Sequence, residues 1–175
     1  RSPLTRLADA LVELSDALGT IGANVALLAR TEIGELDDGA DGASSAMPHK
    51  ANPVRAVLLT AASRQAPALA AQLHGAASTV DERPDGAWHA EWQTLRMLLR
   101  TVGGSAATGV ELARDLRVHE DRIAANVEAA RDELLAERAG YVAGSEDAAA
   151  SPSDYLGDAG LLTDRLIAAA RRELA

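Results

Sequence analysis

A polar segment that runs straight into an apolar helical pattern reads Gly42-Ala43-Ser44-Ser45-Ala46-Met47-Pro48-His49-Lys50-Ala51-Asn52-Pro53. Asn52 is a residue type that caps helices well, and Pro53 suits the first helical position, where its missing N–H costs nothing. We therefore predict a helix that begins at Pro53. Its free N–H groups and positive dipole end would face the segment, beside the charge of Lys50, which favours an anion site. Taken alone, Asn52-Pro53 also fits an ordinary capped helix that follows a surface linker.

The composition indicates one globular chain built from closely packed helices. The sequence has 175 residues, 47% of them apolar, and contains neither Phe nor Cys. Its apolar residues are mostly Ala, Leu and Val, which favour helices that approach closely. The net charge of −9 argues against nucleic acid or an anionic membrane as partner. We expect a cytoplasmic protein with no signal peptide and no membrane span, since no run approaches eighteen apolar residues and Cys is absent.

Apolar residues spaced by three and four positions predict three long helices. The first covers about residues 4–31, the second begins at Pro53, and the third runs from Trp88 to Val110. A heptad-like seam in the first helix consists of Leu4, Leu7, Leu11, Leu14, Leu18, Ile21, Val25 and Leu28. Long helices joined by loops indicate an all-α bundle. Shorter helices are expected after Asp115, the last over about residues 160–174.

Glycine and proline predict local features within this bundle. Gly19 and Gly22 weaken a helix, so we expect another backbone to pack closely against them. Pro67 predicts a kink or a break near Arg64, and Gly103-Gly104 predicts a bend or a close neighbour. The acidic, glycine-rich residues 34–42 show no apolar period and are expected to form a mobile loop, either a lid over a site or a plain linker.

The pattern Ser44-Ser45-x-Met47-Pro48-x-Lys50-x-Asn52-Pro53 resembles the signature motif of the fumarase/aspartase superfamily. The motif departs from the family at Ala43, where a glycine is usual. His49 resembles the adenylosuccinate lyase and 3-carboxy-cis,cis-muconate cycloisomerase branches of that superfamily. Further similarity to the bacterial cycloisomerases lies in Glu82-Arg83, Trp88-His89-Ala90-Glu91-Trp92, Asp154-Tyr155-Leu156-Gly157 and Asp164-Arg165. The resemblance implies that residues 1–115 form part of a central helical bundle with its signature loop at 35–52, and that 116–175 form a small helical C-terminal domain.

The resemblance also implies a cofactor-free reaction. One carboxylate of 3-carboxy-cis,cis-muconate would add across a double bond as a proton joins the neighbouring carbon. In the family, the first serine of the pair transfers the proton, and the lysine and asparagine hold the substrate carboxylate. These roles fall on Ser44, Lys50 and Asn52, with Ser45 assisting the weakly acidic Ser44 and Met47 contacting substrate. An ammonium, an amide and helix N–H groups suit the enediolate that such proton transfer creates.

Arg83 is a candidate for binding a second carboxylate of a tricarboxylate substrate, because guanidinium binds carboxylate through two hydrogen bonds. A surface ion pair with Asp81 or Asp85 is an equally open interpretation. Trp88 and Trp92 lie one helical turn apart and favour a core or subunit contact over a substrate platform. The four histidines, which are His49, His74, His89 and His119, lack the spacing of a metal site.

The resemblance further implies a homotetramer whose active sites are shared between subunits. We expect this chain to be the C-terminal portion of a longer polypeptide and to be inactive alone, since family members carry a histidine-bearing acid/base segment in the part that precedes Arg1. Two alternatives stay open. The first is a lyase of the same superfamily that acts on adenylosuccinate or argininosuccinate. The second is a helical assembly module without catalytic activity.

Overall fold

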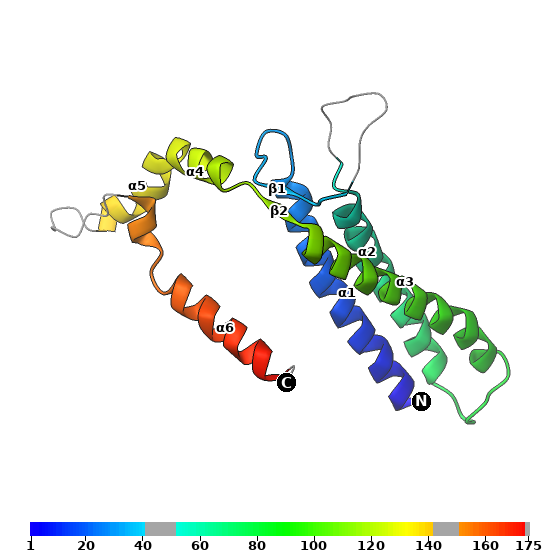
Figure 1. Cartoon of the computed structure of the whole chain (residues 1–175). Helices are drawn as coiled ribbons and strands as arrows, with labels where there is room; N and C mark the ends of the chain where they lie inside the picture. Colours follow the sequence, from blue (N-terminus) through cyan, green and yellow to red (C-terminus); the bar gives the residue numbers. More distant parts are fainter. Residues whose placement is uncertain (41–51, 142–150, 174–175) are drawn as a thin grey trace. The chain divides into compact units, whose positions relative to one another are not determined.

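The computed structural model describes residues 1–40, 52–141 and 151–173 of the chain (Figure 1). Along the sequence it contains α1 (Ser2–Leu28), β1 (Leu36–Asp37), α2 (Val54–Ala77), α3 (Ala87–Asp115), β2 (Arg117–Val118), α4 (Glu120–Ala129), α5 (Arg131–Tyr141), the 3₁₀ helix η1 (Pro152–Tyr155) and α6 (Ala159–Glu173). These elements divide into two compact units, Arg1–Glu120 and Asp121–Ala175. The all-α prediction is confirmed.

The first unit is a bundle in which α1 packs along α2 and both contact α3 (Figure 1). Its buried residues form two clusters, one of Ala8, Ala66, Ala70, Leu73, Leu98 and Val102, the other of Val25, Ala56, Leu59 and Leu112. Of these ten residues, four are alanine, four are leucine and two are valine. Small side chains let the helix backbones approach, so the bundle is held by close helix contacts rather than by aromatic packing.

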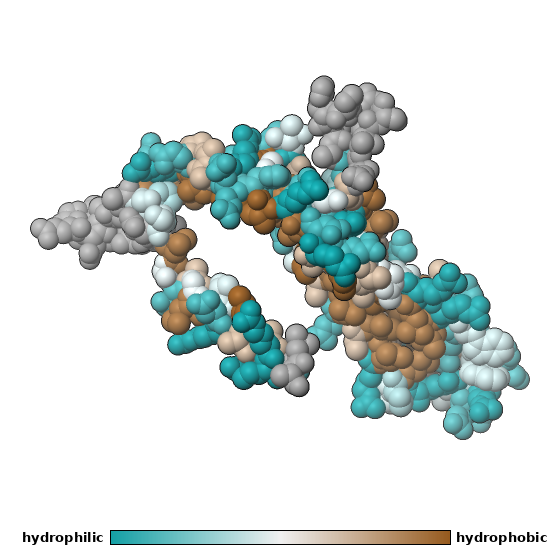
Figure 2. All heavy atoms as spheres, viewed as in Figure 1, coloured by the Kyte–Doolittle hydropathy of each residue, from teal (hydrophilic) through white to brown (hydrophobic). Residues whose placement is uncertain are grey.

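The heptad seam of α1 is only half used within the chain. Leu4, Leu11 and Leu18 pack against the two buried clusters. By contrast, the alternate seam residues Leu7, Leu14 and Ile21 are 43%, 45% and 51% exposed. Figure 2 shows apolar side chains gathered on the surface of this bundle. The chain therefore leaves an apolar stripe of α1 (Leu7, Leu14, Ile21) without cover from α2 or α3.

Close helix approach at Gly19 and Gly22 is confirmed. A Cβ atom on Gly22 would lie 2.5 Å from the carbonyl oxygen of Ala56, and one on Gly19 would overlap the side chain of Ser63. Gly103-Gly104 behaves differently, because a Cβ there would meet no atom within 4 Å among the described residues. The close neighbour predicted as one option at that pair is absent from the described part of the chain.

Two predictions about the helices need correction. Of the kink or break predicted near Arg64, the break does not occur, because α2 continues through Pro67 as one helix. Packing against α1 and α3 outweighs the one lost backbone hydrogen bond. By length and composition, α1 is also apolar enough to cross a membrane, contrary to the expectation that no segment approaches this limit. In the bundle, α1 packs along α2 and also contacts α3, with Ser15 and Val25 buried.

The acidic segment before the signature motif is not a plain loop. Leu36 pairs with Val118 and Asp37 with Arg117 in a short antiparallel ribbon between β1 and β2. The backbone N–H of His119 extends it by donating to the Glu35 carbonyl oxygen at 2.9 Å. The predicted mobile loop over residues 34–42 is therefore wrong for the strand that forms within it, and residues 41–42 lie outside the described part.

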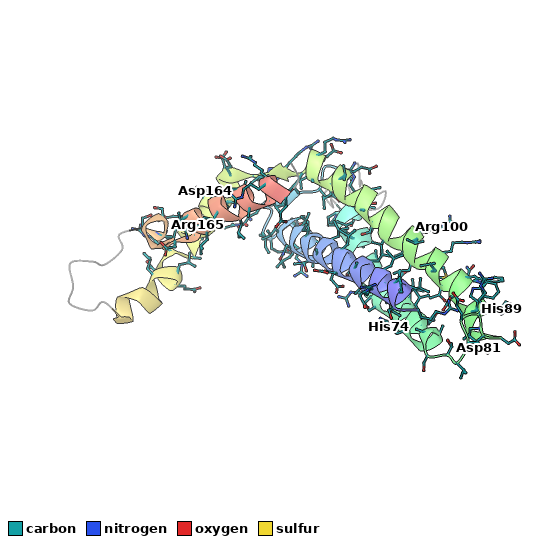
Figure 3. The ribbon with its side chains drawn as sticks, turned by 90° about the horizontal axis from the view of Figure 1, so that it is seen from below. His74, Asp81, His89, Arg100, Asp164 and Arg165 are labelled. Atoms are coloured by element: carbon teal, nitrogen blue, oxygen red, sulfur yellow. The ribbon has the colours of Figure 1, made fainter. Side chains whose placement is uncertain are left out.

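The second unit contains α4, α5, η1 and α6. None of the described residues of α4 or α6 is buried within the chain. The apolar side chains that α6 leaves exposed are Leu161, Leu162, Leu166 and Ile167. Figure 3 labels Asp164 and Arg165, the tail pair singled out in the sequence, on the same helix. Within the described residues this unit therefore gains little stability from buried apolar area.

Candidate active site

Much of the signature motif lies outside the described residues. This applies to Ser44, Ser45, Met47 and Lys50, whose proposed roles stay predictions. The structure does describe the chain on both sides of them: residues 37–40, here called the leading segment, and residues 52–55, called the trailing segment. Figure 1 shows β1, which ends in the leading segment, beside the first turn of α2. The described part of the candidate site lies where these two segments meet.

α2 begins one residue later than predicted. Val54 is its first residue, and Pro53 rather than Asn52 is the N-cap, with no hydrogen bond from its own side chain. The backbone N–H of Val54 instead donates to the carbonyl oxygen of Asn52 at 2.8 Å. Because proline has no side-chain oxygen, the first turn of α2 must find its capping acceptor elsewhere in the chain.

Asp38 supplies that acceptor. Its carboxylate Oδ2 accepts the backbone N–H of Arg55 at 3.0 Å, and Oδ1 accepts the backbone N–H of Ala40 at 3.0 Å. Asp38 is only 2% exposed. A carboxylate on the N–H of the second helical residue has the geometry of an N-cap and also meets the positive end of the helix dipole. The sequence predicted an anion at this helix terminus. At the Arg55 amide, that anion is the carboxylate of Asp38, which belongs to the chain itself.

The side chain of Arg55 ties the same region to α3. Its Nη1 donates to the Asp38 carbonyl oxygen at 3.1 Å and lies 3.0 Å from Asp115 Oδ2. Its Nε lies 3.7 Å from Glu111 Oε2. Gly39, with φ of +67°, lets the leading segment turn close to Asp115, where a Cβ would collide with the backbone. With carboxylates on two sides, the Arg55 guanidinium serves the scaffold.

Asn52 lines a small cavity at this junction. The cavity has a volume of about 210 Å³ and is lined by Ala29, Thr31, Gly34, Leu36, Asp37, Asp38, Ala40, Asn52, Pro53 and His119. Its described walls hold two carboxylates and neither Lys nor Arg. A carboxylate ligand here therefore needs a cation from outside these walls, which is the role predicted for Lys50.

Arg83 lies far from Asn52 within one chain. It belongs to the connection after α2, whereas Asn52 precedes α2, and the 24 residues of that helix span roughly 36 Å. The Arg83 guanidinium lies 5.5 Å from the centre of the Trp88 ring. Figure 3 shows Asp81 and His89, its neighbours in sequence, at the end of the bundle where α3 begins. One chain cannot bring Arg83 and Asn52 to the same small ligand.

Three aromatic rings form a cluster at the start of α3, beside Arg83. Trp88 and Trp92 meet edge to face with ring centres 5.1 Å apart, and the His89 ring lies 4.9 Å from that of Trp92. Trp92 is 53% exposed, so it is not a core residue of this chain. Of the two interpretations offered for the tryptophans, a contact with another subunit fits this exposure better than burial in the core.

Sequence reasoning missed two buried carboxylates. One is Asp38, and the other is Glu91, whose Oε2 accepts Nη1 of Arg1 at 2.9 Å. Glu91 Oε1 has no hydrogen-bond partner among the described residues. Glu91 stands between Trp88 and Trp92 in the sequence. An acidic residue inside this apolar helical pattern was the available signal. Across residues 1–40, 52–141 and 151–173, no three His, Asp or Glu side chains gather closely enough to hold a metal ion.

Comparison with known proteins places this geometry in a family. The chain is 48% identical over 145 residues to nitrosuccinate lyase from Streptomyces davaonensis, covering 81% of this chain and 31% of that protein. It is 39% identical over 140 residues to 3-carboxy-cis,cis-muconate cycloisomerase from Pseudomonas aeruginosa, covering 78% and 30%. The crystal structure of 3-carboxy-cis,cis-muconate lactonizing enzyme from Pseudomonas putida matches with a TM-score of 0.74 and 34% identity, over 81% of this chain and 32% of that one.

The chain belongs to the fumarase/aspartase superfamily. No model of a protein family matches it. The chain spans about a third of the length of the curated relatives that it matches. Within this superfamily the relatives named above are lyases and cycloisomerases, so membership agrees with the resemblance seen in the motif.

Proposed function

We propose that the whole protein is an enzyme that moves a proton at a carbon next to a carboxylate of a small polycarboxylate. The observation that carries this proposal is the 48% identity to nitrosuccinate lyase over a region that contains the signature motif. Ser44 would exchange the proton, assisted by Ser45, while Lys50 and Asn52 hold the carboxylate and Met47 contacts the substrate. Negative charge that spreads onto this carboxylate during reaction is stabilised by a fixed ammonium and an amide.

Elimination from a substituted succinate is the first candidate reaction. With nitrosuccinate as substrate, Ser44 takes a proton from the carbon beside one carboxylate, and the C–H electron pair forms a carbon–carbon double bond. The carbon–nitrogen bond breaks at the same time, and nitrite leaves with its electron pair to give fumarate. The identity is higher to the lyase, at 48%, than to the cycloisomerase, at 39%, which supports this order of candidates.

Cycloisomerisation of 3-carboxy-cis,cis-muconate is the second candidate. A carboxylate oxygen of the substrate adds to a double bond, the displaced electron pair moves to the carbon beside another carboxylate, and that carbon takes the proton. The match to the Pseudomonas putida structure, with a TM-score of 0.74, favours it. Both reactions place charge on the same kind of carbon and need the same carboxylate cradle, so motif and fold support them together.

We propose a homotetramer with shared active sites as the assembled form. Asn52 and Arg83 lie at opposite ends of the 24-residue helix α2, so a site that uses both must take them from different subunits. The exposed stripe of α1 (Leu7, Leu14, Ile21) and the exposed Trp92 offer apolar contact area for such assembly. We accordingly expect the 175-residue chain alone to show no turnover.

Assays of the full-length protein test this function. We expect nitrite release from nitrosuccinate, and a Ser44→Ala variant slower by about 10²-fold or more, the usual contribution of a proton-transferring group. Ser2→Ala, which removes an exposed hydroxyl from α1, is the matched control. Turnover of 3-carboxy-cis,cis-muconate alone would select the second candidate, and activity on adenylosuccinate or argininosuccinate would select another lyase. A folded protein inactive on all four would leave only an assembly role.

A further inference from the structure

We propose that Asp38 is a positioning residue, which fixes Asn52 by binding the leading and trailing segments to each other. This inference rests on the proposed function insofar as Asn52 holds the substrate carboxylate. It begins with one carboxylate that is 2% exposed. Oδ1 of Asp38 accepts from Ala40 in the leading segment, and Oδ2 accepts from Arg55 in the trailing segment, each at 3.0 Å. Both oxygens are thus committed to backbone donors, one on each side of residues 41–51.

A third contact strengthens the link between the segments. Nη1 of Arg55 donates to the carbonyl oxygen of Asp38 at 3.1 Å. Arg55 therefore donates two hydrogen bonds to Asp38, one from its backbone and one from its side chain, although 17 residues separate them in sequence. Asp115 on α3 holds the same Arg55 nitrogen at 3.0 Å. The junction is braced from α3 and is not a flexible crossing of two loops.

The contacts of Asp38 with Arg55 constrain Asn52 through the backbone. Asn52 stands three residues before Arg55, its carbonyl oxygen accepts the N–H of Val54 at 2.8 Å, and Pro53 restricts the backbone torsion between them. Asn52 and Asp38 line the same cavity of about 210 Å³. Moving Arg55 therefore moves Asn52 relative to the cavity, and a shift of about 1 Å in a binding group can cost on the order of 10²-fold in rate.

The same geometry decides which groups can bind a substrate carboxylate. The Arg55 amide at the helix terminus is engaged by Asp38, and the Arg55 guanidinium lies within 4 Å of carboxylates from Glu111 and Asp115. Neither group is offered to a ligand. A substrate carboxylate is then held by side chains such as Asn52, not by the amide of Arg55, so its affinity depends on how Asp38 orients that side chain.

Kinetics of full-length Asp38→Ala and Asp38→Asn variants test the role of this residue. We expect kcat/KM to fall about 10²-fold in Asp38→Ala, with KM raised, because the carboxylate-binding amide is displaced. Asp38→Asn keeps one acceptor oxygen and should recover part of the loss. Leu98→Ala creates a cavity in the buried cluster that contains Ala8 and Leu73. It should lower stability without touching the junction, and it should leave KM unchanged. If Asp38→Ala lowers the unfolding temperature but keeps KM and kcat of the folded enzyme, the positioning role is refuted.

Hydrogen exchange on the 175-residue chain separates this inference from the proposed function, because it needs no turnover. We expect the Arg55 amide to exchange at least about tenfold faster in Asp38→Ala, with the Leu59 amide, one turn further into α2, unchanged. Equal exchange of Arg55 in both proteins would overturn the inference even if the enzyme is active. Faster exchange in a chain whose full-length form turns over none of the substrates would support the anchoring of the segments while the proposed function fails.

Discussion

Asn52 and Arg83 flank α2 at opposite ends, so the length of one helix separates two residues that a single substrate was expected to contact. The 24 residues of α2 correspond to roughly 36 Å, several times the length of a small polycarboxylate. Arg83 also has a local partner, since its guanidinium lies 5.5 Å from the Trp88 ring centre. A role for both residues in one site therefore requires at least two copies of the chain.

Mixed assemblies test whether two copies share a site. In the full-length protein we expect Asn52→Ala and Arg83→Ala each to lower kcat/KM strongly when assayed separately. When the two variants are unfolded and refolded together, sites that take Asn52 from one subunit and Arg83 from another become intact in about a quarter of cases, if subunits mix at random. Activity should therefore return on mixing, measured against each variant refolded alone.

Two results would contradict a site shared by Asn52 and Arg83. If Asn52→Ala and Arg83→Ala mixtures recover no activity although mass measurements show mixed oligomers, the two residues do not act in one shared site. Full activity of the Arg83→Ala variant alone would remove Arg83 from the site and leave its contact with Trp88 as its role.

The exposed stripe of α1 predicts a second effect, on assembly. Replacing Leu7, Leu14 and Ile21 by Ser removes apolar contact area that the chain itself does not cover, so the full-length protein should form smaller species than the proposed tetramer. Light scattering after gel filtration measures the mass. Val80→Ser, at a fully exposed position outside the helices, is the control and should keep the tetramer. An unchanged mass in the triple variant contradicts an interface on this stripe.

The sequence predicted the helices well because their apolar spacing reflects burial directly. The predicted first helix, about residues 4–31, appears as Ser2–Leu28, and the close approach at Gly22 is present. Which half of the heptad seam faces α2 could not be read, since both halves are equally apolar. Even so, the separation of Asn52 from Arg83 followed from the predicted helix between them, and only the inference that one chain could not supply both to the same ligand was missing.

The junction at Asp38 could not be predicted for a different reason. Its hydrogen bond to Arg55 spans 17 residues and exists only once the β1–β2 ribbon and the start of α2 are in place. Locally, Asp37-Asp38-Gly39 resembles any acidic turn, because Asp and Gly favour turns and caps alike. A buried carboxylate is recognised from its surroundings, and those are a property of the fold rather than of the neighbouring sequence.

The contact between Gly22 and α2 predicts a stability effect. In Gly22→Ala the new Cβ would lie 2.5 Å from the Ala56 carbonyl oxygen and 2.9 Å from Leu59 Cβ, so the helices must move apart. We expect a loss of about 1–3 kcal/mol in the free energy of unfolding. Gly103→Ala is the matched control: among the described residues its Cβ meets no atom within 4 Å, and it should gain roughly 0.5–1 kcal/mol, since alanine favours helix.

Urea unfolding of the 175-residue chain, followed by tryptophan fluorescence, gives both numbers. A Gly22→Ala chain as stable as the original would contradict the close approach of α1 and α2. A destabilised Gly103→Ala chain would instead indicate a neighbour at that position, and so a contact with another copy.

The ion pair between the buried Glu91 and the partly exposed Arg1 predicts the last effect. Removing the charge of Arg1 in Arg1→Met leaves the Glu91 carboxylate, with 6% of its side chain exposed, without its cationic partner. An uncompensated buried charge is costly, so we expect a loss of about 2 kcal/mol or more in the free energy of unfolding near neutral pH. Glu91→Gln in the same chain removes that charge, so the Arg1→Met, Glu91→Gln double variant should recover part of the loss. Urea unfolding of the two single variants and the double variant measures this coupling, and strictly additive losses would mean that the 2.9 Å contact contributes nothing to stability.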